Sequence, residues 1–334
     1  MKVTLLDAVF AHCPDDPALI EVLQTGFEGR HIVISSSDIS TLAVQGWLNR
    51  QSEQIQDSSR LAIEDGLLRD AAENMRLQLS IDDRGAADDD WTTMFLSLES
   101  ARQLLRKPLN VWFENDLNDG QFLLSTARQE VRDRLVEWKE KGWIQFQNAG
   151  GIDSIPERSK GLGHLQVIRT MFIFDSDARL PAIPSTSAKM AIDSCRVNDA
   201  TWHCLERRAI ENYIPPGTLK AWASKTDLRG PEGRSLKHAV WAFSRLSAEQ
   251  RCHFNLKKGF DRDSRSTATT WSPEDLVEFW KGVSDDDRGK LNNGIQSGIA
   301  QKIFGSGLVP YSHLVNDKSN AELDTIAQML MEGV

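Results

Sequence analysis

The sequence predicts an α/β fold in which helices flank a mostly parallel sheet. Three short runs rich in aromatic and β-branched residues have the composition of buried strands, at 109–113, 143–146 and 171–174. Helix-length segments separate these runs, as the crossovers between parallel strands require. Ligands of such sheets bind beyond the carboxyl ends of the strands. The residues that follow the three runs are therefore candidates for a site: Glu114, Gly150-Gly151 and Asp175-Ser176-Asp177.

The segments that connect and follow these strands have recognisable patterns. Residues 115–120 have the composition of a turn. The segment 120–141 has apolar residues three and four positions apart and ends before a glycine, which predicts one amphipathic helix. A fourth strand is predicted at 202–205. A helical turn is predicted at 206–213, because two prolines follow it.

Asp175 and Asp177 are two positions apart at the end of a predicted strand. On an extended chain such residues point the same way, so both carboxylates could bind one hard cation such as Mg²⁺. Asp-x-Asp pairs are also common in solvated turns, and the pair gains weight because Glu114 ends a second strand. We therefore expect a divalent-cation site at this edge of the sheet.

Residues 1–105 carry fewer clear signals. We interpret them as an α/β or helical region that is regulatory or binds a partner. Asp7 falls at a predicted strand end, but one carboxylate makes no second site. The elements predicted here are strands at 3–10 and 31–35, helices at 42–56, 59–79 and 98–106, and an acidic loop at 82–90.

Residues 217–334 are predicted to be basic and mainly helical. A Ser-Pro helix start at 272–273 and a capping box at 319–322 support the helical prediction. The stretch 217–262 has ten basic and four acidic residues, a net charge of +6, whereas the whole chain carries −9. A basic region beside an acidic site suits a polyanionic ligand, although a solvated loop region would have the same composition.

The composition limits the class of protein. With 334 residues the chain can form more than one domain, and 40% hydrophobic and 26% charged residues are ordinary for a globular protein. No run of 18 apolar residues and no secretion signal is present, so we expect a cytoplasmic protein without a membrane span. The four cysteines form no Cys-x-x-Cys pair, and we expect neither a zinc site nor a disulfide framework.

The order of these motifs resembles the Toprim domain, in particular that of the OLD (overcoming lysogenization defect) nucleases. The resemblance rests on strand-Glu114, strand-Gly-Gly and strand-Asp-Ser-Asp, followed by 202–214, which contains Glu211-Asn212-Tyr213. It covers about 108–216 and a lysine farther on.

The resemblance implies a Rossmann-like Toprim core at 106–216 that binds Mg²⁺ or Mn²⁺. The metal ligands that it implies are Glu114, Asp119, Asp175, Asp177 and Glu211. The catalytic residues that it implies are Glu114, Asp175, Asp177 and a lysine, for which Lys257 and Lys258 are the candidates. Glu114 could alternatively relay a proton.

Two positions depart from the family pattern. Toprim domains usually have glycine after the first glutamate, and this chain has Asn115, which tolerates a left-handed backbone and so would preserve the turn. The OLD-type acid four residues after that glutamate is Asn118 here. Asp119 or Asp116 would have to replace it.

The activity that the resemblance implies is metal-dependent endonuclease cleavage of DNA or transfer RNA, as the toxic effector of an anti-phage defence system. OLD-type proteins usually couple this domain to an ATPase. This chain has no Gly-x-x-x-x-Gly-Lys-Ser/Thr loop, which implies a separate ATPase or sensor as partner. A homo-oligomer is left open. The alternative function is a non-catalytic binding subunit whose metal site is degenerate.

Overall fold

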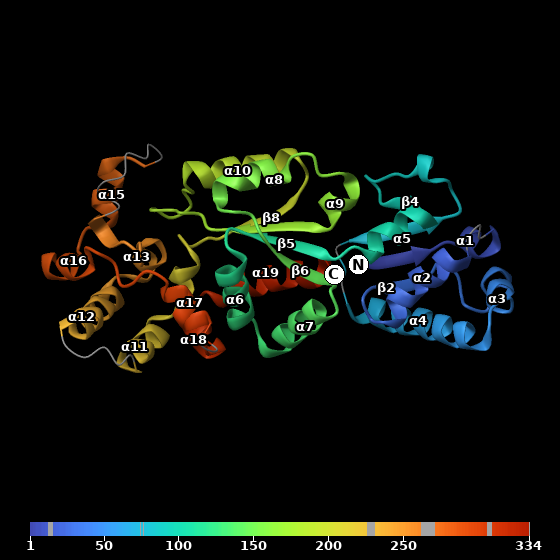
Figure 1. Cartoon of the computed structure of the whole chain (residues 1–334), viewed down its shortest axis with the longest axis horizontal. Coiled ribbons are helices and arrows are strands. Elements are labelled where there is room, and N and C mark those ends of the chain that lie inside the picture. The colour runs from blue at the N-terminus through green and yellow to red at the C-terminus, as the bar shows by residue number, and fades with distance from the viewer. Residues whose placement is uncertain are drawn as a thin grey trace.

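The computed structural model describes residues 1–12, 16–73, 75, 77–225, 231–261, 271–305 and 309–333. It contains two four-stranded parallel sheets flanked by helices, which agrees with the predicted α/β class. In Figure 1 the two sheets lie end to end along the long axis of the molecule. The described helices between residues 216 and 291 lie at the end remote from the first sheet.

The first sheet has the strand order β2-β1-β3-β4. Its strands are β1 (Lys2–Leu5), β2 (Ile32–Ser35), β3 (Gln78–Asp82) and β4 (Phe95–Ser97). Its helices are α1 (Asp7–His12), α2 (Asp16–Phe27), α3 (Leu42–Leu48), α4 (Glu53–Ala72) and α5 (Leu98–Arg106), with a 3-10 turn η1 (Ala86–Asp88). The N-terminal region is therefore α/β.

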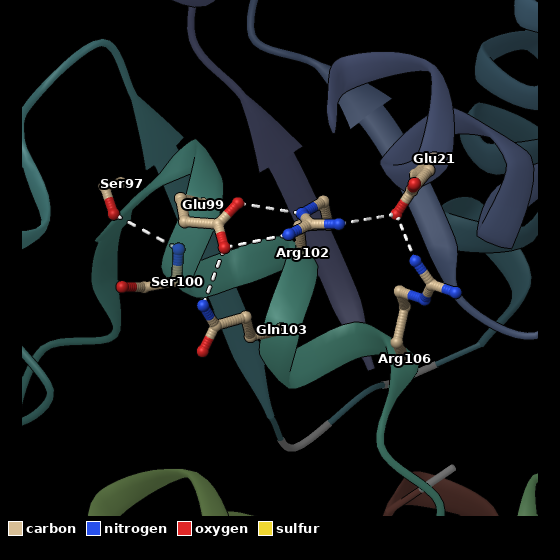
Figure 2. A network of polar contacts seen from close by, with 7 residues as sticks. All are labelled: Glu21, Ser97, Glu99, Ser100, Arg102, Gln103 and Arg106. Atoms are coloured by element: carbon tan, nitrogen blue, oxygen red, sulfur yellow. Dashed lines mark hydrogen bonds and ion pairs between the residues drawn. The ribbon is translucent and has the colours of Figure 1, made fainter. Parts of the chain in front are cut away.

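Helix α5 joins this sheet to the rest of the chain, and the predicted helix at 98–106 is confirmed. The Ser97 side chain caps it by accepting a hydrogen bond from the Ser100 N–H. Arg102 and Arg106 of α5 both bind the Glu21 carboxylate of α2, at 3.1 Å and 2.7 Å, as Figure 2 shows. These ion pairs attach α5 to α2 at the surface.

Several predictions for this region were wrong. The predicted strand at 3–10 ends at Leu5, and Asp7 begins α1 instead of ending a strand. The predicted helix at 42–56 is interrupted between Leu48 and Glu53. Strands β3 and β4 were not predicted. They are short, and only two residues of each are buried, so their sequence pattern is weak.

The second sheet has the strand order β6-β5-β7-β8. Its strands are β5 (Leu109–Phe113), β6 (Ile144–Asn148), β7 (Thr170–Phe174) and β8 (Thr201–Cys204), which confirms the four predicted strands to within two residues. The helices around it are α6 (Asp116–Thr126), α7 (Gln129–Glu140), α8 (Ile155–Ser159), α9 (His164–Ile168) and α10 (Thr186–Val197), with 3-10 turns η2 (Ile152–Ser154) and η3 (Ile210–Tyr213).

All five residues of β7 are buried, because helices cover both faces of this sheet. Met171 and Ile173 pack into the apolar cluster that contains Phe122 of α6. Phe172 and Phe174 alternate to the opposite face and pack with the alanines of α10. Strand β7 is therefore fixed from both sides.

The chain 115–141 differs from its prediction. Instead of a turn and one helix, it forms α6 and α7, which are separated at Ala127 and Arg128. The Thr126 hydroxyl donates to the Phe122 carbonyl, and the Arg132 guanidinium donates to the carbonyls of Leu124 and Ala127. These side chains satisfy the last carbonyls of α6, so the helix can end there.

Among the described residues of the C-terminal region, the regular secondary structure is all helical. It contains α11 (Pro216–Lys225), α12 (Pro231–Arg245), α13 (Ala248–His253), α15 (Pro273–Phe279), α16 (Asp285–Leu291), α17 (Ile299–Phe304), α18 (Tyr311–Asn316) and α19 (Asn320–Gly333). The predicted serine cap of α15 is confirmed, because the Ser272 side chain accepts from the Asp275 N–H. Helix α19 returns to the second sheet, where Gly333 packs against Leu109.

None of the helices in the described ranges is long and apolar enough to cross a membrane. Cys195, Cys204 and Cys252 are free thiols, and Cys13 lies outside the described residues. The predicted division of the chain at 105–106 and 216–217 stays an interpretation.

Candidate functional site

Strands β5 and β7 are neighbours at the point where the strand order reverses, since the chain moves from β5 to β6 on one side and then to β7 on the other. Crevices at such reversal points are the usual ligand sites of open parallel sheets. Glu114 follows β5 and Asp175 follows β7. Glu114 Oε1 accepts a hydrogen bond from the Asp175 backbone N–H at 2.9 Å, so the two predicted residues are in contact.

The two residues after Asp175 connect this edge to the segment that carries Glu211. Asp175 Oδ1 accepts from the Ile210 N–H at 3.1 Å. The Ser176 hydroxyl donates to the Arg207 carbonyl at 2.8 Å, and the Asp177 N–H donates to the Arg208 carbonyl at 2.8 Å. These bonds place Glu211, in η3, beside the carboxyl ends of β5 and β7.

Asp177 does not continue the extended chain. Its φ is +46°, in the left-handed region that costs a non-glycine residue free energy. The expectation that Asp175 and Asp177 point the same way along a strand was therefore wrong. Asp177 nevertheless lies near the other carboxylates, because it lines the same cavity as Glu211. Burial is the main cause of the raised pKa of Glu114, and the charge of Asp177 adds to it.

Gly150 and Gly151 both have positive φ, +86° and +99°. The Gly151 N–H donates to the Glu114 carbonyl at 3.2 Å. The glycine pair thus provides the turn after β6 that lets the chain hydrogen-bond to the backbone of Glu114.

Asn115 is the N-cap of α6, with an extended backbone at φ −140°. Its side chain accepts a hydrogen bond from the Asn118 N–H. The expectation of a left-handed turn at Asn115 was therefore wrong. The helix that begins here positions Asp119, whose Oδ2 accepts from the Asn115 N–H at 3.0 Å.

Of the two acids at the start of α6, Asp119 rather than Asp116 lies in the electrostatic environment of Glu114 and Asp175. The charge of Asp119 raises the pKa of both Glu114 and Asp175. Asp116 instead accepts a hydrogen bond from the Asn148 side chain at 3.0 Å.

Five carboxylates therefore share one electrostatic environment, which we call the acidic cluster: Glu114, Asp119, Asp175, Asp177 and Glu211. Burial, with the neighbouring negative charges, raises the pKa of Glu114 to about 7 and that of Asp119 to about 6. The same causes raise the pKa of Asp175 well above its usual value. Carboxylates crowded in this way need a cation to remain ionised together at neutral pH.

Lys257 provides part of that positive charge. Its amine lies 3.0 Å from Glu211 Oε1, and its charge lowers the pKa of Glu114, Asp119 and Asp175. Although burial lowers the pKa of Lys257 itself, the charges of Glu211 and Asp175 raise it above its usual value. Of the two candidate lysines, Lys257 is thus the one that contacts the acidic cluster.

Glu211 is 4% exposed, and its second oxygen, Oε2, has no hydrogen-bond partner among the described residues. An unpaired buried carboxylate oxygen is costly, because it loses its water without gaining a donor. A divalent cation held by oxygen ligands fits this atom. No group of three His, Cys, Asp or Glu side chains in the described ranges is already arranged as a metal site. Metal binding would therefore require side chains of the acidic cluster to rearrange.

A cavity of about 500 Å³ opens beside the acidic cluster. Its acidic lining residues are Asp177 and Glu211. Cationic and hydroxyl side chains also line it, and they include Arg179, Arg208, Lys257, Lys258 and Ser187. We call this space the site cavity.

Only part of the predicted basic region contributes to the site cavity. Lys257 and Lys258 line it, whereas Arg245 pairs with Asp287 of α16. Arg229 and Arg262 lie outside the described residues.

Sequence reasoning missed Glu322, which holds the segment that carries Glu211. Its carboxylate accepts from the Glu206 N–H at 2.8 Å and from the Tyr213 hydroxyl, and it contacts His203 Nε2 at 2.9 Å. The sequence pattern assigned Glu322 to a capping box at the start of α19. Its described contacts are instead with residues 203–213. The predicted helical turn at 206–213 is in fact irregular as far as η3, with Glu206 exposed.

No protein-family model, curated protein or solved structure matches this chain.

Proposed function

We propose that this protein is a Toprim-type, metal-dependent endonuclease that hydrolyses phosphodiester bonds of nucleic acid. The observation that carries the proposal is the acidic cluster at the reversal point between β5 and β7, with the unpartnered Oε2 atom of Glu211 inside it. Its motif order, Glu114, Gly150-Gly151, Asp175-Ser176-Asp177 and Glu211, supports the assignment. Clusters of carboxylates are the usual holders of Mg²⁺ in phosphoryl-transfer sites.

In this proposal Glu114, Asp119, Asp175, Asp177 and Glu211 hold Mg²⁺ or Mn²⁺. Bound divalent ions would make water a better nucleophile and neutralise charge on the phosphate and leaving oxygens. In hydrolysis, a water oxygen bonds to phosphorus as the bond to one ester oxygen breaks. A water proton goes to a base, and the leaving oxygen gains a proton, which gives a phosphate monoester and a hydroxyl.

Two residues have further roles in this step. As an alternative to the ligand role, Glu114 could accept the water proton, because burial raises the pKa of this carboxyl to about 7. Lys257 is a point charge next to Glu211, where it can stabilise the negative charge that builds on the phosphate.

The proposed biological role is an anti-phage effector controlled by a separate ATPase or sensor protein. It follows from the resemblance to OLD-type nucleases and from the absence of a phosphate-binding Gly-Lys-Ser/Thr loop in the sequence. DNA and transfer RNA are both retained as substrates.

The test is cleavage of plasmid DNA and, in parallel, of a transfer-RNA pool, with Mg²⁺ or Mn²⁺ and with EDTA. We expect metal-dependent cleavage of one substrate by the wild-type protein and its loss in Glu114→Ala. Metal-dependent cleavage that Glu114→Ala retains in full would refute the assignment of the site.

The second candidate function is a non-catalytic binding subunit. Asn115 and Asn118, the departures from the family pattern, favour it, as does the Lys257–Glu211 ion pair, which already occupies one carboxylate oxygen. A degenerate site predicts that Mn²⁺ does not stabilise the protein against unfolding, whereas the nuclease proposal predicts that it does.

A further inference from the structure

Side chains of both charges line the site cavity. Asp177 and Glu211 are its acidic residues, and Oε2 of Glu211 is buried without a hydrogen-bond partner in the part of the chain that the structure describes. A bound cation would stabilise that unpaired oxygen atom. Lys258, an exposed residue, also lines the cavity, so an anion is favoured within the same space.

The N-terminus of α10 opens into this cavity through Ser185, Thr186 and Ser187. Helix α10 has 12 residues, and its first turn carries the partial positive charge that attracts phosphate. The Ser185 side chain caps the helix by accepting from the Ala188 N–H at 3.2 Å.

The start of α10 is fixed relative to the acidic cluster. The Ser185 N–H donates to the Ser176 carbonyl at 2.9 Å, and Ser176 lies between Asp175 and Asp177. A phosphate at this helix start would therefore lie next to carboxylates that require a cation. A phosphate with a bound metal ion would supply the cation that the carboxylates need and the anion that the helix start favours.

The volume of the cavity and its aromatic lining limit which molecule could carry that phosphate. A volume of about 500 Å³ is within the range of pockets that bind one small molecule, and a nucleic-acid duplex cannot enter it. Trp271 also lines the cavity, and although both side chains are largely buried, its ring lies 5.0 Å from the Arg179 guanidinium. Guanidinium and aromatic planes are surfaces on which unpaired bases stack.

We propose that the site cavity binds one unpaired nucleotide, with its phosphate at the N-terminus of α10 and near Lys258, so that the substrate is single-stranded nucleic acid. This inference rests on the proposed nuclease function and narrows its substrate class. A duplex would be bound only after a nucleotide leaves the stack, which costs free energy.

The test measures binding, with Ca²⁺ in place of Mg²⁺ and the oligonucleotide checked for cleavage afterwards. A labelled single-stranded oligonucleotide and the duplex of the same sequence are compared, in a deoxyribose and a ribose version. We expect the single strand to bind at least about tenfold more tightly than the duplex. Equal or tighter binding of the duplex would overturn the proposal.

Ser187→Asp tests the position of the phosphate. An acid in the first turn is favourable for the helix, so the fold should be retained, but its charge repels a phosphate there. We expect binding of the single strand, and of the probe thymidine 3′,5′-bisphosphate, to weaken about tenfold, as it should in Lys258→Gln. Met190→Glu is the matched control, because it adds the same charge to α10 at an exposed residue, 51% accessible.

Equal effects of Ser187→Asp and Met190→Glu on binding would contradict the proposed phosphate position. Mn²⁺-dependent stabilisation, measured on the same proteins, separates this failure from failure of the nuclease proposal. If the wild type is stabilised by Mn²⁺ but shows no preference for the single strand, only the substrate inference fails. If Mn²⁺ has no effect on the wild type, the metal site itself is wrong.

Discussion

The two sheets of this protein share a strand order and differ in what lies at their reversal points. In each, the first and third strands are central, and all neighbours are parallel. After β1 of the first sheet, Asp7 accepts hydrogen bonds from the hydroxyls of Ser36 and Ser37, at 3.3 Å and 2.7 Å. After β5 of the second sheet, Glu114 is half-buried among other carboxylates.

This difference shows that a shared strand order does not by itself create a functional site. Charges on the helices of the first sheet are paired at the surface, as Glu21 is with Arg102 and Arg106, and such pairs contribute little free energy (Figure 2). The acidic cluster of the second sheet instead keeps like charges together, at a cost that a functional cation would offset. The proposed function therefore rests on the residues of the second sheet, not on its architecture.

The largest expected effect separates the two sheets by activity. Asp175→Asn should lower metal-dependent cleavage by on the order of 10³-fold, because it removes a charged ligand from the acidic cluster. Asp7→Asn is the matched change at the reversal point of the first sheet and should leave cleavage within about twofold. Comparable losses in both variants would remove the distinction drawn between the sheets.

The next effect is on stability as a function of pH in the absence of metal. Burial raises the pKa of Glu114 from 4.5 to about 7, so between these values the folded protein binds more protons than the unfolded chain. The free energy of unfolding should therefore fall as pH rises from 5 to 8, by about 3 kcal/mol from this group. Urea unfolding in EDTA measures it. Glu114→Gln should flatten the profile, and Asp7→Asn should not.

A smaller effect concerns the support of Glu211 by the C-terminal helix. Glu322→Gln keeps the size of the side chain but removes the charged acceptor of the Tyr213 hydroxyl and the Glu206 N–H. We expect a loss of about 2 kcal/mol in the free energy of unfolding and weaker Mn²⁺ binding. Asp324→Asn, on the same helix but bonded to Arg128, is the control for stability without an effect on Mn²⁺ binding. Unchanged Mn²⁺ affinity in Glu322→Gln would show that Glu322 does not position the site.

The smallest expected effect is on Mn²⁺ affinity, and it tests the role of Lys257. Lys257→Gln removes a cation that competes with metal for Glu211, so the affinity for Mn²⁺ should rise about tenfold, or about 1.4 kcal/mol, while cleavage falls. Lys258→Gln removes the same charge one residue along and should change Mn²⁺ affinity by less than about twofold. Calorimetric titration measures both. Equal changes in the two variants would mean that Lys257 has no special contact with the cluster.

The strands of the second sheet were the most predictable part of the fold. All residues of 170–174 are buried, and such a strand leaves a continuous apolar pattern in the sequence. Residues 109–113 alternate between buried and half-buried side chains, but the run is short and rich in aromatic and β-branched residues. The carboxylates that follow them could be predicted as well, because the carboxyl ends of parallel strands meet at one edge.

The features of the fold that could not be predicted have two causes. Some depend on contacts between residues far apart in the sequence, and others on side chains that take the place of backbone N–H groups as hydrogen-bond donors. Helix α6 ends where Thr126 and Arg132 take its last carbonyls, although the apolar spacing continues. Glu322 is 109 positions from the Tyr213 that it binds, and its local pattern favoured a helix cap. Asp177 adopts a left-handed backbone that the residue type does not signal.

The most direct test of the acidic cluster as a metal site is thermal unfolding at pH 8 with increasing Mn²⁺, for the wild type and for Glu211→Gln. At free Mn²⁺ of about 100 times Kd, binding should stabilise the wild-type protein by about 2.7 kcal/mol. Glu211→Gln should lose most of this stabilisation, because it replaces the carboxylate whose Oε2 has no partner among the described residues. No effect of Mn²⁺ on the wild type, or an equal effect on both proteins, would contradict the assignment.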